Sequence, residues 1–145
     1  MTKRARANWQ ALRELLWNRC EGRCEVSGRP LDPDTFDLHH RRNKGMGGTS
    51  RPDTDLPLNL LALDPRVHNG GPASVHADRN GVSGPNGWLV SKLNDRPGDV
   101  PVLLRPTPEF EQWFILTEAG LRVPISALKR VRLPRPLPVI GRPAK

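Results

Sequence analysis

The chain has 145 residues, a length that suits one domain with a modest core, and its formal net charge is +8. Sixteen prolines and thirteen glycines beside only 36% hydrophobic residues predict a loop-rich protein. No stretch approaches the roughly 20 apolar residues that span a membrane, the basic start lacks the apolar segment of a signal peptide, and two cysteines make no disulfide framework. We therefore expect a cytoplasmic protein. The basic charge favours a polyanionic partner, although it also serves solubility alone.

Residues 8 to 20 have the periodicity of an amphipathic helix. The apolar stripe consists of Trp9, Leu12, Leu15, Leu16 and Cys20, and the polar face of Arg13, Glu14, Asn18 and Arg19. Glu21-Gly22 ends the helix. We expect this element to pack on the rest of the fold. The basic residues before it either touch phosphates or form a solvated end, and these residues are Lys3, Arg4 and Arg6.

A short strand and turn are expected over residues 24 to 31, followed by a turn at Asp32-Pro33-Asp34. The next run, FDLHH (36–40), reads as a strand. Successive side chains of a strand point to opposite faces, so His39 and His40 have different tasks. Asp37 shares the face of His39 and is either a hydrogen-bond acceptor for that imidazole or a solvated carboxylate.

The loop over residues 41 to 55 is rich in basic residues and glycine. Its cations are Arg41, Arg42, Lys44 and Arg51. Its glycines let a backbone approach a phosphate chain closely. We expect this loop to contact DNA, the alternative being a flexible polar loop.

The run LPLNLLAL (56–63) has the length of a second strand and lies between prolines, which predicts a hairpin with the first strand. Gly70-Gly71-Pro72 is typical of a helix start, because proline is tolerated in a first turn. His76 would then lie about one turn inside a short helix that Asn80-Gly81 ends.

Beyond this helix we expect a small antiparallel sheet. A turn feeds a short strand over residues 84 to 92, and further strands are expected at 100–104, 113–117 and 121–125, the last at an edge because of Pro124. Trp88 and Trp113 either pack in the core, which their apolar neighbours favour, or stack on bases. Residues 129 to 145 are basic and proline-rich, which predicts a poorly ordered tail after a single domain over residues 1 to 128.

All four histidines lie between residues 36 and 79, and imidazole is the commonest protein metal ligand. In order, the chain has the His39-His40 pair, Asn59 in NLLAL, His68 ending DPRVH and His76 in SVH. This series, with the HHRRNKGMGG loop, resembles the HNH (ββα-metal) endonucleases, particularly the small HNH proteins of actinobacterial phages. The resemblance covers roughly residues 20 to 105. It implies an α+β fold with a ββα-metal core at about 36–80, the packing helix before it and the small sheet after it.

The resemblance also implies a role for each of these residues. His40 would be the general base that deprotonates the attacking water, and His39 and His68 would be ligands of one divalent cation. His76 would be a third ligand or a phosphate contact, because eight positions separate it from His68 where the family has about one helical turn. Asn59 would brace the loop or orient the base.

Many members of the family carry two CxxC pairs around a structural zinc ion. Here Cys24 keeps one of the four positions, and the others are occupied by Ser27, Asp64 and Val67. We therefore expect no structural zinc. Cys20 and Cys24 are interpreted as ordinary, partly buried thiols, with a metal or disulfide role as the alternative.

These inferences lead to a metal-dependent HNH endonuclease that nicks or cuts DNA, using Mg²⁺ or Mn²⁺, with Zn²⁺ or Ni²⁺ also accepted by imidazole. By analogy with the phage proteins, it would act in an infected bacterial cell near genome packaging, with the terminase as partner and with no membrane or small-molecule cofactor involved. The alternative is a DNA-binding or packaging accessory protein that keeps the fold without cleavage. A zinc-finger-like regulator is disfavoured because the cysteine ligands are missing.

Overall fold

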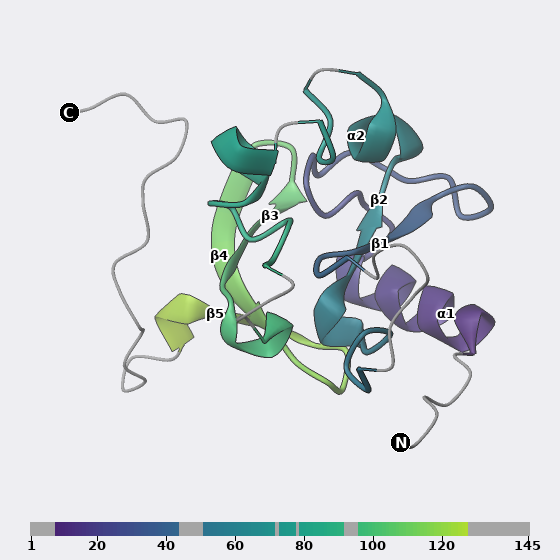
Figure 1. Cartoon of the computed structure of the whole chain (residues 1–145). Coiled ribbons are helices and arrows are strands. Elements are labelled where there is room, and N and C mark those ends of the chain that lie inside the picture. Colours follow the sequence, from purple (N-terminus) through teal and green to yellow (C-terminus); the bar gives the residue numbers. More distant parts are fainter. Residues whose placement is uncertain (1–7, 44–50, 72, 78, 92–95, 128–145) are drawn as a thin grey trace.

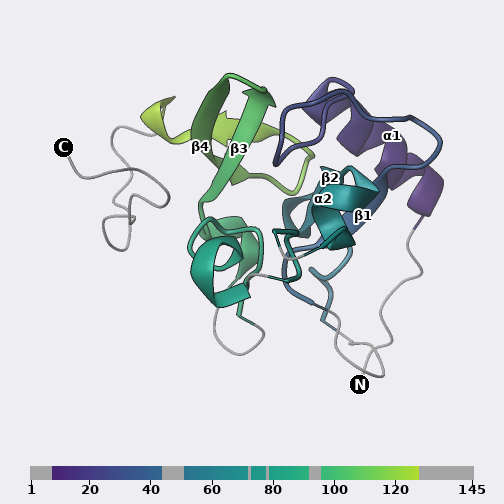
Figure 2. The same ribbon diagram turned by 90° about the horizontal axis from the view of Figure 1, so that it is seen from above.

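The computed structural model describes residues 8–43, 51–71, 73–77, 79–91 and 96–127. Helix α1 (Trp9–Cys20) is followed by strands β1 (Asp37–His40) and β2 (Leu60–Leu63), helix α2 (Pro65–Asn69), and strands β3 (Val102–Thr107), β4 (Phe110–Leu116) and β5 (Arg122–Pro124). The strands form two antiparallel sheets, β1-β2 and β3-β4-β5. Figure 1 shows the three-stranded sheet to one side of the β1–β2 hairpin, and Figure 2 shows the same separation from above. The α+β class is confirmed.

Helix α1 begins and ends where its sequence predicts. The side chain of Asn8 caps the first turn by accepting a hydrogen bond from the Ala11 amide at 3.1 Å. At the other end, Glu21 adopts a left-handed conformation with φ of 55°, and the Gly22 amide bonds back to the Trp17 carbonyl at 3.2 Å. The helix buries Leu16 and Cys20 against β2, so it packs on the hairpin as expected.

Arg19 departs from the prediction that it lies on the polar face of this helix. Its guanidinium is buried, and it holds the carboxylate of Glu25 through two bonds, of 3.1 Å and 2.6 Å. It also donates to the carbonyls of Pro57 and Leu60. The helical pattern could not reveal this, because the partners come from the chain that follows the helix and from the start of β2.

The β1–β2 hairpin pairs His39 with Leu61 and His40 with Leu60. Strand β2 is shorter than the apolar run that predicted it. Residues Pro57–Asn59 form a 3₁₀ turn, and the strand proper begins at Leu60, from which all four side chains are buried. A strand buried on both faces explains why the sequence shows a continuous apolar run instead of an alternating one.

The predicted helix over residues 72 to 80 is wrong in position. The helix of this region is α2, which begins at Pro65, separated from the end of β2 by one residue. Asp64 caps it by accepting a hydrogen bond from the Arg66 amide at 2.8 Å. Helix α2 ends at Gly70, where a Cβ would lie 2.3 Å from the Arg66 carbonyl oxygen. His68 therefore lies on the helix, and His76 lies in a following segment of turns.

The C-terminal sheet agrees with the predicted strands within a few residues, and β5 lies at its edge, as Pro124 requires. Residues 84 to 91 form the expected turn but only one bridge, between Val90 and Arg42. Cys20 and Cys24 are free and buried in a core cluster shared by α1, β2, β3 and β4. Among the described residues, no helix has the length and the apolar character needed to cross a bilayer.

Candidate metal centre

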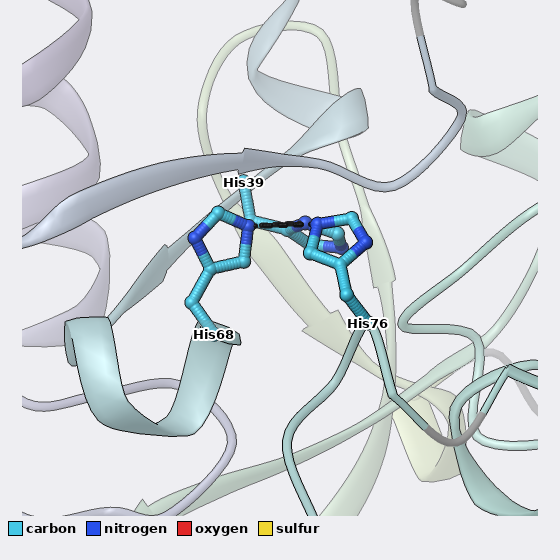
Figure 3. Close-up of side chains that lie close together, drawn as sticks. All are labelled: His39, His68 and His76. Carbon is cyan, nitrogen blue, oxygen red and sulfur yellow. Dashed lines mark hydrogen bonds between the residues drawn. The ribbon is translucent and has the colours of Figure 1, made fainter. Parts of the chain in front are cut away.

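Three histidines from three segments meet at one point beside β1. His39 comes from β1, His68 from α2, and His76 from the turns that follow α2, as Figure 3 shows. One ring nitrogen from each lies within 4.8 Å of the others. Nε2 of His68 is central, at 3.2 Å from Nδ1 of His39 and 2.9 Å from Nε2 of His76. The structure therefore brings together the three histidines that the sequence analysis named as ligands.

The hydrogen bonds on the outer side of two of these rings determine which nitrogen carries a proton. Nε2 of His39 lies 2.6 Å from the carbonyl oxygen of Trp88, and Nδ1 of His68 lies 2.9 Å from Oδ2 of Asp37. A carbonyl and a carboxylate accept hydrogen bonds, so each of these nitrogens is the N–H donor of its ring. Nδ1 of His39 and Nε2 of His68 then each carry a lone pair, and these two nitrogens face each other at 3.2 Å.

Two lone pairs at this distance repel each other unless a cation lies between them. Zinc–imidazole bonds are about 2.0–2.1 Å long, so two nitrogens of a tetrahedral site are about 3.3 Å apart. The spacings around His68, 3.2 Å and 2.9 Å, are close to this value. The donor set, with these two spacings, could therefore hold a metal ion, and three protein ligands would leave coordination positions for water or substrate.

Burial keeps the ring of His39 neutral. Desolvation lowers the pKa of His39 from 6.5 to about 3, the Trp88 carbonyl raises it, and the neighbouring rings of His68 and His76 lower it further. A neutral imidazole is the form that binds metal. His39 is thus available as a ligand throughout the neutral range.

Asp37 contacts a different histidine from the one expected. The sequence analysis placed it beside His39, whereas its carboxylate bonds His68. The reason is that α2 lies against β1, and His39 already uses its outer nitrogen on Trp88. Nδ1 of His68 has two polar contacts. The Asp37 carboxylate, at 2.9 Å, is closer than the Asn69 side-chain amide, at 3.3 Å. Metal-bound histidines usually have such a carboxylate or carbonyl partner, which fixes the ring.

His40 has separate surroundings. Successive strand side chains point to opposite faces, so His40 is directed away from the three-histidine group. Its Nε2 lies 2.8 Å from Oδ1 of Asp55, its side chain is 14% exposed, and the ring of Trp9 meets it edge-on at 5.8 Å. The sequence analysis did not single out Asp55, because nothing in the loop distinguishes it from Asp53.

Asn59 holds both ends of the loop that follows β1. Its Oδ1 accepts a hydrogen bond from the Arg42 amide at 2.7 Å, and its Nδ2 donates to the carbonyls of Thr54 at 2.8 Å and Arg42 at 3.2 Å. The side chain is fully buried. Asn59 therefore makes loop-bracing contacts.

Arg41 corrects the expectation that the basic loop residues lie on a DNA-contacting surface. It is fully buried, and its guanidinium donates to four carbonyls at 2.8–2.9 Å, those of Leu58, Gly87, Pro97 and Val100. Burial lowers the pKa of Arg41 to about 9, so it stays charged at neutral pH. These carbonyls belong to irregular segments that converge on the arginine, and that of Pro97 also accepts from the Val100 amide at 3.2 Å.

Of the other residues expected to contact DNA, one is buried, one is exposed and one lies outside the described residues. Arg42 is buried and forms an ion pair with Asp53. Arg51 is exposed. Lys44 lies outside the described residues, as do Lys3, Arg4, Arg6 and the tail over 129–145.

Comparison of the chain with models of protein families, with curated proteins and with solved structures finds no match in any of the three. What can be said of its chemistry therefore comes from the residues themselves. They form a three-histidine group that could hold a metal ion, and the residue after His39 in β1, His40, pairs with Asp55 of the following loop.

Proposed function

We propose that the protein is a metal-dependent endonuclease of the HNH type that hydrolyses phosphodiester bonds in DNA. The observation that carries the proposal is the convergence of His39, His68 and His76 with outer acceptors on two of the rings. The order of these residues and of Asn59 along the chain, with His39 on the hairpin and His68 on the helix after it, supports the HNH type.

In the proposed mechanism a divalent cation, Mg²⁺ or Mn²⁺ in the working enzyme, supplies Lewis acidity toward the scissile phosphate. His39 and His68 hold their lone pairs toward it, and Trp88 and Asp37 keep both rings in the required tautomer. Hydrolysis joins the oxygen of a water molecule to phosphorus and breaks the bond from phosphorus to the 3′ oxygen. The products carry a 5′ phosphate and a 3′ hydroxyl.

His40 would accept the proton of the attacking water. Its Nε2 donates to Asp55, so Nδ1 is the nitrogen that would take up the proton. Because it is directed away from the three-histidine group, His40 is not consumed as a ligand. General-base catalysis by such a group typically contributes roughly 10²–10⁴-fold.

A second candidate is a DNA-binding or packaging accessory protein on the same fold, without cleavage. The net charge of +8 supports DNA binding without cleavage, and the burial of Arg41 and Arg42 removes two expected DNA contacts under either candidate. In either case, a phage origin and the terminase as partner are proposals by analogy.

The test is cleavage of supercoiled plasmid with Mg²⁺ or Mn²⁺, comparing the wild type, the wild type with EDTA, His39→Ala and His40→Ala. We expect conversion to nicked or linear DNA that requires the metal and both histidines. Retained DNA binding without cleavage under any divalent ion would favour the accessory protein.

A further inference from the structure

A groove of about 890 Å³ lies near the metal centre. Three of the residues that line it are linked to the metal ligands, by sequence or by a hydrogen bond. Val67 of α2 lines the groove, and the next residue is His68. Ser74 lines it two residues before His76. Trp88 lines it as well, and its carbonyl accepts the hydrogen bond from His39. The groove therefore adjoins the segments that carry His68 and His76, and the residue whose carbonyl bonds His39.

Three arginines line the groove and leave their charge accessible. Arg29 is exposed and has no ion pair among the described residues. Arg66 approaches Asp64 only at 3.5 Å with its side chain 90% exposed, and Arg105 approaches Glu111 at 3.5 Å with its side chain 45% exposed. Long, exposed ion pairs are weak, so these cations can exchange their partners for phosphates.

The wall of the groove also holds a buried polar atom without a partner. Asn86 is 3% exposed, and its Oδ1 forms no hydrogen bond. Its backbone is fixed by bonds to Val82 and Leu103, both 2.9 Å long, so only the side-chain amide is unsatisfied. An unpaired buried polar group is destabilising. A hydrogen-bonding ligand in the groove would supply the partner that this amide lacks.

Trp88 presents a fixed aromatic surface in the same groove. Its indole nitrogen donates to the Leu103 carbonyl at 2.7 Å, and the ring is only partly buried. Cationic grooves with an aromatic side chain are the usual way to bind single strands, because every base has a face that can stack. The volume lies within the range of roughly 300–1,000 Å³ typical of small-ligand pockets, which suits unpaired nucleotides and not a duplex.

We propose that this groove binds an unpaired segment of the DNA substrate, with phosphates at Arg29 and Arg105 and a base between Trp88 and Asn86. The inference rests on the proposed function and adds to it the form of DNA beside the metal centre. It predicts a preference for single strands or for duplexes that open at the site of cleavage.

The experiment measures fluorescence anisotropy of a labelled oligo(dT) of about a dozen nucleotides and of a duplex of equal length, in EDTA so that neither is cut. The full-length protein is expected to bind the single strand more tightly. Arg29→Glu should weaken this binding about 10-fold. Arg96→Glu is the matched control, because Arg96 is an exposed arginine outside the groove, and should weaken it less than about 3-fold.

Asn86→Ala is a second variant, and it tests whether Asn86 acts in binding or in stability. Because its Oδ1 forms no hydrogen bond, we expect weaker binding of the single strand, by about 5-fold, without a lower midpoint of thermal unfolding. A lower midpoint with unchanged binding would overturn the role of Asn86.

Equal affinity for the single strand and the duplex, or equal effects of Arg29→Glu and Arg96→Glu, would overturn the groove as a binding site for unpaired DNA. These outcomes are distinct from failure of the proposed function. A protein that binds the single strand through Arg29 but never cleaves plasmid keeps the groove and loses the nuclease. A protein that cleaves without any effect of Arg29→Glu keeps the nuclease and loses the groove.

Discussion

The two neighbouring histidines of β1 have the same side chain and different surroundings. His39 is 1% exposed, faces two other imidazoles and bonds a backbone carbonyl. His40 is 14% exposed in its side chain and bonds a carboxylate. Burial beside two other imidazoles favours a neutral His39 ring whose lone pair can be held toward a cation, whereas the carboxylate partner of His40 orients that ring.

The comparison shows how one strand separates two tasks. Alternation of side chains puts adjacent residues on opposite faces, so a ligand and a base can be neighbours in sequence without sharing a proton. Each ring also has its own orienting group, Trp88 for His39 and Asp55 for His40. If the two faces of β1 are independent, a change beside His40 should leave metal affinity unchanged.

The largest effect should come from removing a proposed ligand. His68→Ala deletes the central nitrogen of the group, and we expect metal affinity to fall more than about 100-fold, beyond the effect of losing an outer partner. Isothermal titration with Ni²⁺, which imidazole binds tightly, measures it. His40→Ala is the control and should stay within about 3-fold of the wild type. Similar losses in both variants would place His40 among the ligands and contradict the separation of tasks between the two faces of β1.

The two carboxylates allow a matched pair of isosteric changes. Asp37→Asn removes the charged acceptor of His68 and should lower metal affinity about 10- to 100-fold, as expected for outer partners of metal-bound histidines. Asp55→Asn should leave metal affinity unchanged and slow plasmid cleavage, because Asp55 bonds His40, which is directed away from the three-histidine group. A metal defect in Asp55→Asn would mean that the two faces are coupled.

Sequence predicted the parts of this arrangement that depend on local pattern. The capped helix α1, the strand that carries His39 and His40, and the antiparallel C-terminal sheet follow from periodicity and turn residues. The sequence predicts the helix of this region too late in the chain, because Pro65 suits the end of a strand and the first turn of a helix equally well. It therefore predicts a helix at His76, whereas the structure has His68 on the helix.

The contacts that orient the site could not be predicted, because they join distant parts of the chain. The acceptor for His39 is a backbone carbonyl at Trp88, which has no signature in sequence. The burial of Arg41 depends on four carbonyls that only the folded chain brings together. A basic residue in a glycine-rich loop resembles a phosphate contact until those carbonyls are known.

The buried face should also give the metal-free protein a pH-dependent stability. The pKa of His39 is about 3 in the folded protein and near 6.5 in the unfolded chain. As the pH falls below 6.5, only the unfolded chain takes up this proton, so stability should fall by about 2 kcal/mol between pH 7 and pH 5. Urea unfolding in EDTA measures it. His39→Gln lacks this group and should show a shallower dependence, and equal slopes in the two proteins would contradict the buried, neutral ring.

The smallest effect should come from Trp9, whose ring meets His40 edge-on at 5.8 Å. Such ring pairs contribute about 0.5–1.5 kcal/mol, so Trp9→Leu should slow cleavage by only about 2- to 10-fold. Metal affinity should not change, because Trp9 contacts the face of β1 that lacks the ligands. The decisive comparison is a double-mutant cycle: in a His40→Ala background, Trp9→Leu should slow the residual cleavage no further. A further loss there would mean that Trp9 acts on the substrate or on the fold, and that orientation of His40 depends on Asp55 alone.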